Sequence, residues 1–208
     1  MSSYLITHSL IASWNYLYSC YESCEEDAYN DFLSTLNRIP KESTPEMQNG
    51  IDFENEVYRF ASGAQTTSLP SAMKWEKGIK VVATIIKGAP TQVKASRELF
   101  IGSTHIHVYG ILDALKAGTI FDVKFSNKSF SSAELPGKYL DSSQHPTYLY
   151  LVPEAKKFTY LVSDGEDLYT ETYTRANTRP LGEIVKEFLC SLEAMRLMDI
   201  YKEKWITG

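Results

Sequence analysis

Two aspartates and a lysine lie close together in a segment that reads as a β-hairpin, residues 108–125. Folding this hairpin about Ala117-Gly118 sets Asp113 directly opposite Asp122, and the two-residue period of a strand puts Lys124 on the same face as Asp122. Two carboxylates that face each other across a ladder repel. A divalent cation bound between them turns that repulsion into coordination, and carboxylate oxygens are ligands that Mg²⁺ and Mn²⁺ prefer. The residue types and their spacing therefore predict a metal site with a cationic side chain beside it.

An acidic residue two positions before a lysine has little value by itself, because short motifs arise by chance. The chain contains a second such triplet, Glu154-Ala-Lys156, which directly follows Pro153 and has no aspartate upstream across a hairpin. We interpret this second triplet as a solvated turn. Only its surroundings can therefore raise the Asp122-Val-Lys124 triplet above chance.

The Asp122 triplet has companions in a definite order along the chain. These are Glu54, Gly110, Asp113, Gln144 and Tyr148. The glutamate falls on a predicted amphipathic helix of about residues 51–62. The glutamine and the tyrosine lie four residues apart, on one face of a predicted helix that begins at about Ser142. Proline is tolerated in the first turn of such a helix, where Pro146 stands.

This order of helix glutamate, strand aspartate, aspartate-x-lysine and glutamine-x-x-x-tyrosine resembles the PD-(D/E)XK nuclease superfamily. It is most similar to the RecB-like branch, which includes phage exonucleases of the lambda type. The resemblance extends over about residues 5–165, because Thr7–Trp14 also looks like the serine-rich N-terminal helix of RecB-like proteins. It implies an α/β fold in which helices flank a mixed central β-sheet, the restriction-endonuclease-like core.

The resemblance also implies a role for each residue of the pattern. Asp113 and Asp122 bind a Mg²⁺ or Mn²⁺ ion through their carboxylates. Glu54 supplies a further ligand directly or through water, and the Val123 carbonyl completes the shell. Lys124 positions the attacking water and helps to deprotonate it, or stabilises charge on the scissile phosphate. Physical chemistry agrees with these roles, because a bound divalent ion lowers the pKa of its water and offsets charge on phosphate oxygens.

Four further residues are candidates for contacting DNA. By the resemblance, Gln144 and Tyr148 contact the DNA backbone or support the site, although Tyr148 is alternatively a core residue. Lys128 and Lys138 belong to a segment rich in Ser, Asn, Lys and Gly, residues 126–140, which we interpret as a loop. A basic loop beside a metal site suits a phosphate backbone, but both lysines are alternatively plain solvated residues.

Several alternatives stay open at this point. The two aspartates are alternatively solvent-facing residues of an ordinary hairpin. Glu54 has competitors in Asp52 and Glu56, because a helix rotated differently presents another carboxylate. His105 and His107 share a strand face, from which they reach the site or find partners on the strand itself.

The chain departs from the family pattern in two places. Many RecB-like nucleases place a histidine four residues after the helix glycine, whereas here Gly50 is followed at that spacing by Glu54, as in the lambda-exonuclease-like pattern. Iron–sulfur versions have one cysteine near the N-terminus and three near the C-terminus, whereas this chain has Cys20, Cys24 and Cys190. We therefore expect no iron–sulfur cluster and interpret the cysteines as buried or idle thiols.

The rest of the sequence predicts the elements that must position these residues. Helical spacing of apolar residues predicts helices at both ends of the chain, over residues 4–36 and about 181–205. Alternating segments predict strands at 94–101, 105–109, 157–162 and 168–173, the last two joined as a second hairpin. The less regular segments are a loop at 38–46, a break or cap at Asn49-Gly50, a possible helix start at 70–75, and a strand or buried helix end at 79–86.

Composition sets the outer limits. A chain of 208 residues with 43% hydrophobic content suits one globular domain, residues 1–208. The net charge of −5 argues against a uniformly basic nucleic-acid coat, yet a nuclease needs only a local basic rim around an acidic metal site. No run approaches 18 apolar residues and no secretory signal is visible, so we expect no membrane association and a cytoplasmic location.

These observations together predict a Mg²⁺- or Mn²⁺-dependent DNA nuclease that hydrolyses phosphodiester bonds with a metal-activated water. The small size favours an exonuclease of phage or prophage recombination or repair, with DNA as partner and a homo-oligomer or recombination protein as further possible partners. The main alternative is a catalytically silent nucleic-acid-binding or interaction module on the same fold. A third is an unrelated metal-dependent hydrolase of small phosphates. The motif leaves exonuclease against endonuclease activity, strand preference and polarity open.

Overall fold

A computed structural model describes residues 2–64, 74–130 and 135–207 of the chain. The described residues form one mixed β-sheet with helices packed around it, which confirms the predicted α/β class. No described helix is long and apolar enough to cross a membrane. The possible helix start predicted at residues 70–75 lies largely outside the described residues.

The sheet among the described residues has seven strands, in the order β6-β5-β4-β3-β1-β7, with β2 also paired to β3. The strands are β1 (Ser3–Thr7), β2 (Thr91–Ile101), β3 (Thr104–Lys116), β4 (Thr119–Phe125), β5 (Lys157–Ser163), β6 (Leu168–Tyr173) and β7 (Ile206–Thr207). The β1–β3 and β4–β5 pairs are parallel and the others antiparallel. Every segment predicted as a strand is a strand, and 157–162 and 168–173 form the predicted hairpin.

The long strand β3 organises the centre of the sheet. Its residue Ala114 pairs with both β2 and β4, so these two strands lie on opposite edges of β3. Residues 105–109 pair with both β1 and β2, so β1 lies on the same edge as β4. Between the two ladders, residues 110–113 pair with no described strand on that edge. We call this stretch the fork, because β1 and β4 diverge from β3 on either side of it.

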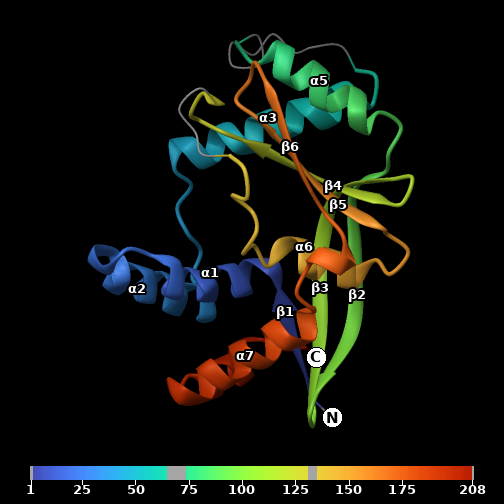
Figure 1. Cartoon of the computed structure of the whole chain (residues 1–208). Coiled ribbons are helices and arrows are strands. Elements are labelled where there is room, and N and C mark those ends of the chain that lie inside the picture. The colour runs from blue at the N-terminus through green and yellow to red at the C-terminus, as the bar shows by residue number, and fades with distance from the viewer. Residues whose placement is uncertain (1, 65–73, 131–134, 208) are drawn as a thin grey trace.

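Helices cover the sheet in two groups, joined by a short helix at the fork. The helices are α1 (His8–Ser19), α2 (Glu25–Leu36), α3 (Pro45–Ala61), α5 (Glu76–Ile86), α6 (Gln144–Leu151), α7 (Leu181–Ala194) and α8 (Met198–Lys204), with 3₁₀ turns at Glu22–Cys24 and Arg175–Asn177. Figure 1 shows α3 and α5 together at one end of the sheet, α1, α2 and α7 gathered beside β1, and α6 between the two groups.

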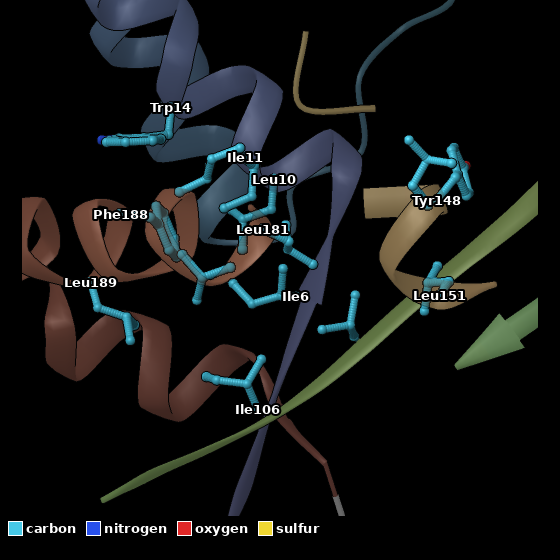
Figure 2. Close-up of a cluster of buried hydrophobic side chains, with 14 of the residues drawn as sticks. Ile6, Leu10, Ile11, Trp14, Ile106, Tyr148, Leu151, Leu181, Phe188 and Leu189 are labelled. Carbon is cyan, nitrogen blue, oxygen red and sulfur yellow. The ribbon is translucent and has the colours of Figure 1, made fainter. Parts of the chain in front are cut away.

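Each helical group has its own hydrophobic core. In the larger core, α1 and α7 meet the sheet through apolar side chains such as Leu10, Phe188 and Ile106, and Tyr148 and Leu151 extend this cluster along α6 (Figure 2). In the smaller core, Phe53 of α3 and Ile79 of α5 pack on the other face of the sheet. These two cores converge on the fork from different sides.

The helix α3 is longer than its apolar pattern predicted. Its N-cap is Thr44, whose Oγ1 accepts the Met47 N–H at 3.2 Å, and Pro45 occupies the first helical position, where proline is favoured. Asn49-Gly50 neither breaks nor caps this helix, contrary to the prediction, because both residues lie inside it, and a Cβ added at Gly50 would meet nothing within 4 Å among the described residues. The predicted loop at 38–46 consequently ends at the Thr44 cap.

Two other predictions need correction. The first residues of the chain form β1 and not the start of a helix, and the parallel partner that makes Tyr4–Ile6 a strand is far away in sequence, at residues 106–108. The predicted closing helix of about 181–205 is two helices, because Arg196 has a left-handed backbone with φ of 60° between α7 and α8. Residues 79–86, for which a strand or a helix end was left open, belong to α5.

Candidate active site at the fork

Asp122 and Lys124 project from β4 on the face that α6 covers. Lys124 Nζ lies 2.8 Å from Asp122 Oδ2, as expected for residues two apart in a strand. Gln144, the first residue of α6, donates from Nε2 to Asp122 Oδ1. The aspartate is 4% exposed, and both of its oxygens contact protein groups, Oδ1 the Gln144 amide and Oδ2 the Lys124 ammonium. The charge of Asp122 is therefore already balanced by groups of the protein.

Asp113 does not form the predicted direct pair with Asp122. The β3–β4 hairpin has the expected register, but its ladder ends at Ala114–Phe121, one pair short of the two aspartates. Instead, Asp113 Oδ2 accepts the main-chain N–H of Val123 at 2.8 Å. Like charges directly opposite destabilise a ladder, and a carboxylate that takes a backbone donor avoids that arrangement. The ligand role predicted for the Val123 carbonyl stays a prediction.

Glu54 is the carboxylate that α3 turns toward this site. Its neighbours on the helix are engaged elsewhere, since Asp52 accepts from Gln48 Nε2 at 2.8 Å and Glu56 binds Arg59 at 2.8 Å. Burial, followed by repulsion from the Asp113 carboxylate, raises the pKa of Glu54 to about 7. Of the three carboxylates that the sequence offered on this helix, Glu54 is therefore the one that lies near Asp113.

Burial and charge act in opposite directions on the β4 pair. Burial raises the pKa of Asp122, while Lys124 and the Gln144 amide lower it. Burial alone lowers the pKa of Lys124, but Asp122, Asp113 and Glu54 raise it overall, so its ammonium stays charged. One lysine thus faces three carboxylates, which leaves the site short of positive charge.

Tyr58 lies one turn after Glu54 on α3. Burial first, and then the Asp113 and Glu54 carboxylates, raises the pKa of its phenol, which keeps the hydroxyl protonated. Among the described residues, no group meets hydrogen-bond geometry with this buried hydroxyl. The residue was visible in the sequence one helical turn from Glu54, but spacing alone did not show that it faces the same carboxylates.

His8 is a site residue that sequence reasoning missed. It is the first residue of α1, directly after β1, and its Nδ1 lies 3.0 Å from Ser143 Oγ, next to Gln144. Burial, then the positive charge of Lys124, lowers the pKa of His8 to about 3, so the imidazole is neutral. Its position depends on the β1–β3 pairing, which the local sequence does not reveal.

Gln144 and Tyr148 support the fork from α6. The Tyr148 hydroxyl donates to the Ile111 carbonyl at 2.9 Å, which satisfies a main-chain group on the unpaired edge. Its ring packs so tightly on Gly110 that a Cβ there would lie 2.6 Å from Tyr148 Cε1. Because both α6 side chains are buried, the geometry matches the supporting role; the DNA contact predicted for them stays a prediction.

The predicted basic and histidine candidates form no hydrogen bond or salt bridge with the site residues within the described part of the chain. Lys128 and Lys138 are exposed, and Lys138 Nζ sits 5.8 Å from the Tyr139 ring centroid. His105 and His107 lie 2.7 and 2.6 Å from the two carboxylate oxygens of Glu98, across the β2–β3 hairpin. The two histidines therefore have a partner on their own hairpin, which agrees with the plainer of the two interpretations.

The donor set fits a hard divalent cation by its chemistry. Glu54, Asp113 and Asp122 offer only carboxylate oxygens, which Mg²⁺ and Mn²⁺ prefer as ligands. Burial first, and then the neighbouring carboxylates, raises the pKa of Glu54 and of Asp122. As the side chains stand, no group of three or more His, Cys, Asp or Glu among the described residues is arranged to hold a metal ion. Lys124 lies against Asp122, so coordination there requires the ammonium to move aside.

The fold is shared with proteins of known structure. The protein SSO0001 superposes with a TM-score of 0.50 and 15% identity, over 94% of this chain and 78% of that one. LHK-Exo, whose crystal structure was determined in complex with dAMP, superposes with a TM-score of 0.53 and 15% identity, over 96% of this chain and 92% of that one. No protein-family model and no curated protein matches the chain in sequence. At such low identity the likeness shows the fold.

Proposed function

We propose that the protein is a Mg²⁺- or Mn²⁺-dependent DNA nuclease whose active site is the fork. The observation that carries the proposal is that Glu54 of α3 and Asp113 of β3 lie close enough to the Asp122–Lys124 pair of β4 for their charges to act on Lys124. The fold supports it, because LHK-Exo is an exonuclease of the same fold. An exonuclease of phage or prophage recombination or repair type is the specific form we favour, with DNA as the partner.

The carboxylates would hold the metal ion, Asp113 and Asp122 directly and Glu54 directly or through water. Bound there, a divalent ion supplies an activated water and offsets charge on the scissile phosphate. Lys124 keeps its proton and its charge at Nζ, where it orients the attacking water or stabilises the phosphate oxygens. Gln144 holds Asp122 in place through Oδ1, and the neutral His8 adds a hydrogen-bonding group without adding charge.

The decisive experiment is metal-dependent degradation of labelled linear and circular DNA, comparing wild type with Asp122→Ala. Loss of a metal ligand removes several kcal/mol of transition-state stabilisation, so we expect a rate reduction of about a thousandfold or more. The matched control is Glu154→Ala, from the other acid-x-lysine triplet, which the structure places on an exposed turn as the sequence indicated. Its activity should equal that of wild type.

The outcomes separate the alternatives. Degradation of linear but not circular DNA supports an exonuclease, and cutting of both supports an endonuclease. If wild type degrades DNA no faster than Asp122→Ala, the nuclease proposal is wrong and the silent binding module becomes the better reading. Activity on a nucleotide or phosphomonoester, without activity on DNA, supports the hydrolase of small phosphates.

A further inference from the structure

Gln92 adopts a backbone conformation that its residue type disfavours. Its φ is 53°, in the left-handed region, although it lies inside β2 and is not a glycine. The residues on either side keep the β2–β3 register, with Thr91 opposite Ala114 and Val93 opposite Leu112. The conformation is therefore a local kink at one residue, and such a kink costs about 1–2 kcal/mol for a side chain with a Cβ.

The kink falls opposite Asp113. In the β2–β3 register, Gln92 stands across from Asp113, and this is the pair at which the ladder is interrupted. The Gln92 side chain reaches the same residue, since its Nε2 donates to Asp113 Oδ1 at 3.4 Å. The other carboxylate oxygen, Oδ2, accepts the Val123 N–H at 2.8 Å. Donors from both flanking strands thus contact the two oxygens of this carboxylate.

An amide is suited to orient a metal-binding carboxylate. Lys124 orients Asp122 with a full positive charge, which competes with a cation for the same oxygen. The Gln92 amide carries no net charge, and a carboxylate oxygen that accepts one hydrogen bond keeps a lone pair for a metal ion. The strain at Gln92 accordingly coincides with a candidate metal ligand whose hydrogen-bond donors carry no net charge. Backbone strain that persists at a site is commonly tied to its function.

We propose that Gln92 is a positioning residue of the active site, whose strained backbone directs its amide to Asp113 and sets that carboxylate for metal binding. The inference rests on the proposed function. Removing groups that orient metal ligands typically reduces metal affinity or activity 10- to 100-fold. Relieving the strain at the same position should, however, make the protein more stable.

The test uses two substitutions that accept a left-handed backbone and lack the reach of the amide. Gln92→Gly keeps the kink without any side chain, and Gln92→Asn keeps an amide one carbon shorter, in a residue type that tolerates this conformation. We expect the melting temperature of Gln92→Gly to rise by about 2–4 °C. We expect Mn²⁺ affinity, measured by calorimetry on the full chain, to fall about tenfold or more in both variants.

Gln48→Ala is the matched control, because Gln48 also donates its amide to an aspartate, Asp52, at 2.8 Å on an exposed part of α3. It should bind Mn²⁺ as wild type does. Unchanged Mn²⁺ affinity in both Gln92 variants would show that the kink merely bends β2, and would overturn the inference while leaving the nuclease proposal intact. A wild-type protein that binds no Mn²⁺ and degrades no DNA would overturn both.

Discussion

The two halves of the fork differ in how their charges are compensated. On the α6 side, Asp122 has Lys124 and Gln144 against its two oxygens, and the larger hydrophobic core lies behind it. On the α3 side, Glu54 and Asp113 repel each other in front of the smaller core, and neither forms a salt bridge within the described residues, while the charge of Lys124 acts on Glu54 from β4. The α6 side is therefore neutralised by the protein itself, whereas the α3 side is left with charge that an external cation can neutralise.

The largest expected effect on stability comes from removing the counter-ion of Asp122 on the α6 side. Lys124→Ala leaves Asp122 buried without its counter-ion, and breaking a buried ion pair from one side is strongly destabilising. We expect a loss of about 2–3 kcal/mol in the free energy of unfolding, below the value for a fully buried pair because the Lys124 side chain is 33% exposed. Urea unfolding at neutral pH measures it.

The control is Lys156→Ala, which changes the exposed lysine of the second acid-x-lysine triplet. We expect no change in its free energy of unfolding. An equal loss of stability in the two variants would contradict the claim that the buried Asp122 depends on Lys124 as its counter-ion.

Two glycines should respond in opposite directions to the same substitution. Gly110→Ala drives a methyl group into the Tyr148 ring on the α6 side, and overpacking of this kind costs about 1–3 kcal/mol. Gly50→Ala, on the helix of the α3 side, meets nothing within 4 Å and replaces a poor helix former, so it should stabilise by about 0.5–1 kcal/mol. Thermal unfolding of the two variants tests both signs. Destabilisation by Gly50→Ala would contradict the long α3.

The last effect concerns how the stability of the α3 side depends on pH. A carboxyl whose pKa is about 7 in the folded protein and 4.5 otherwise binds more protons when folded, so its contribution to stability is present below pH 4.5 and is lost as pH rises to 7. Glu54→Gln lacks this dependence. Relative to wild type, the variant should gain about 1–2 kcal/mol between pH 4.5 and 7.5, a value reduced for partial exposure.

The measurement is urea unfolding in a metal chelator at several pH values. His8 acts in the opposite direction, because its lowered pKa makes stability fall as pH decreases from 6.5 toward 3. The difference between variant and wild type removes that shared contribution. Added Mn²⁺ should abolish the gain, since the cation stabilises the ionised carboxylate of wild type. If the stability difference between Glu54→Gln and wild type did not change with pH, Glu54 would not be a buried carboxyl with a raised pKa.

The α6 side was the more accessible of the two from sequence alone. Its parts are related by short-range rules, the strand period that joins Asp122 to Lys124 and the helix period that joins Gln144 to Tyr148. The α3 side depends on which way a helix faces, and three carboxylates within five residues of α3 satisfy the local pattern equally well. The packing of Phe53 and Val57 in the smaller core fixes that rotation.

Contacts between distant segments were beyond sequence reasoning. The approach of His8 to Ser143 depends on strand β1, whose short apolar run sits directly before a helical stripe and reads as part of it. The kink at Gln92 gave no signal either, because glutamine is not a residue that favours a left-handed backbone. The hairpins, by contrast, were predicted correctly because turn residues and strand alternation both act over a few positions.

The placement of β1 has a consequence for the order of folding. Its register joins Ser3 to His105, whereas the hairpins that carry Asp113 and Asp122 close within a few residues. Contacts between segments distant in sequence require closing a long loop and form slowly relative to local ones. We therefore expect the two aspartates to come together early, on their hairpin, and His8 to join them only in a late step, when the first strand finds its parallel partner.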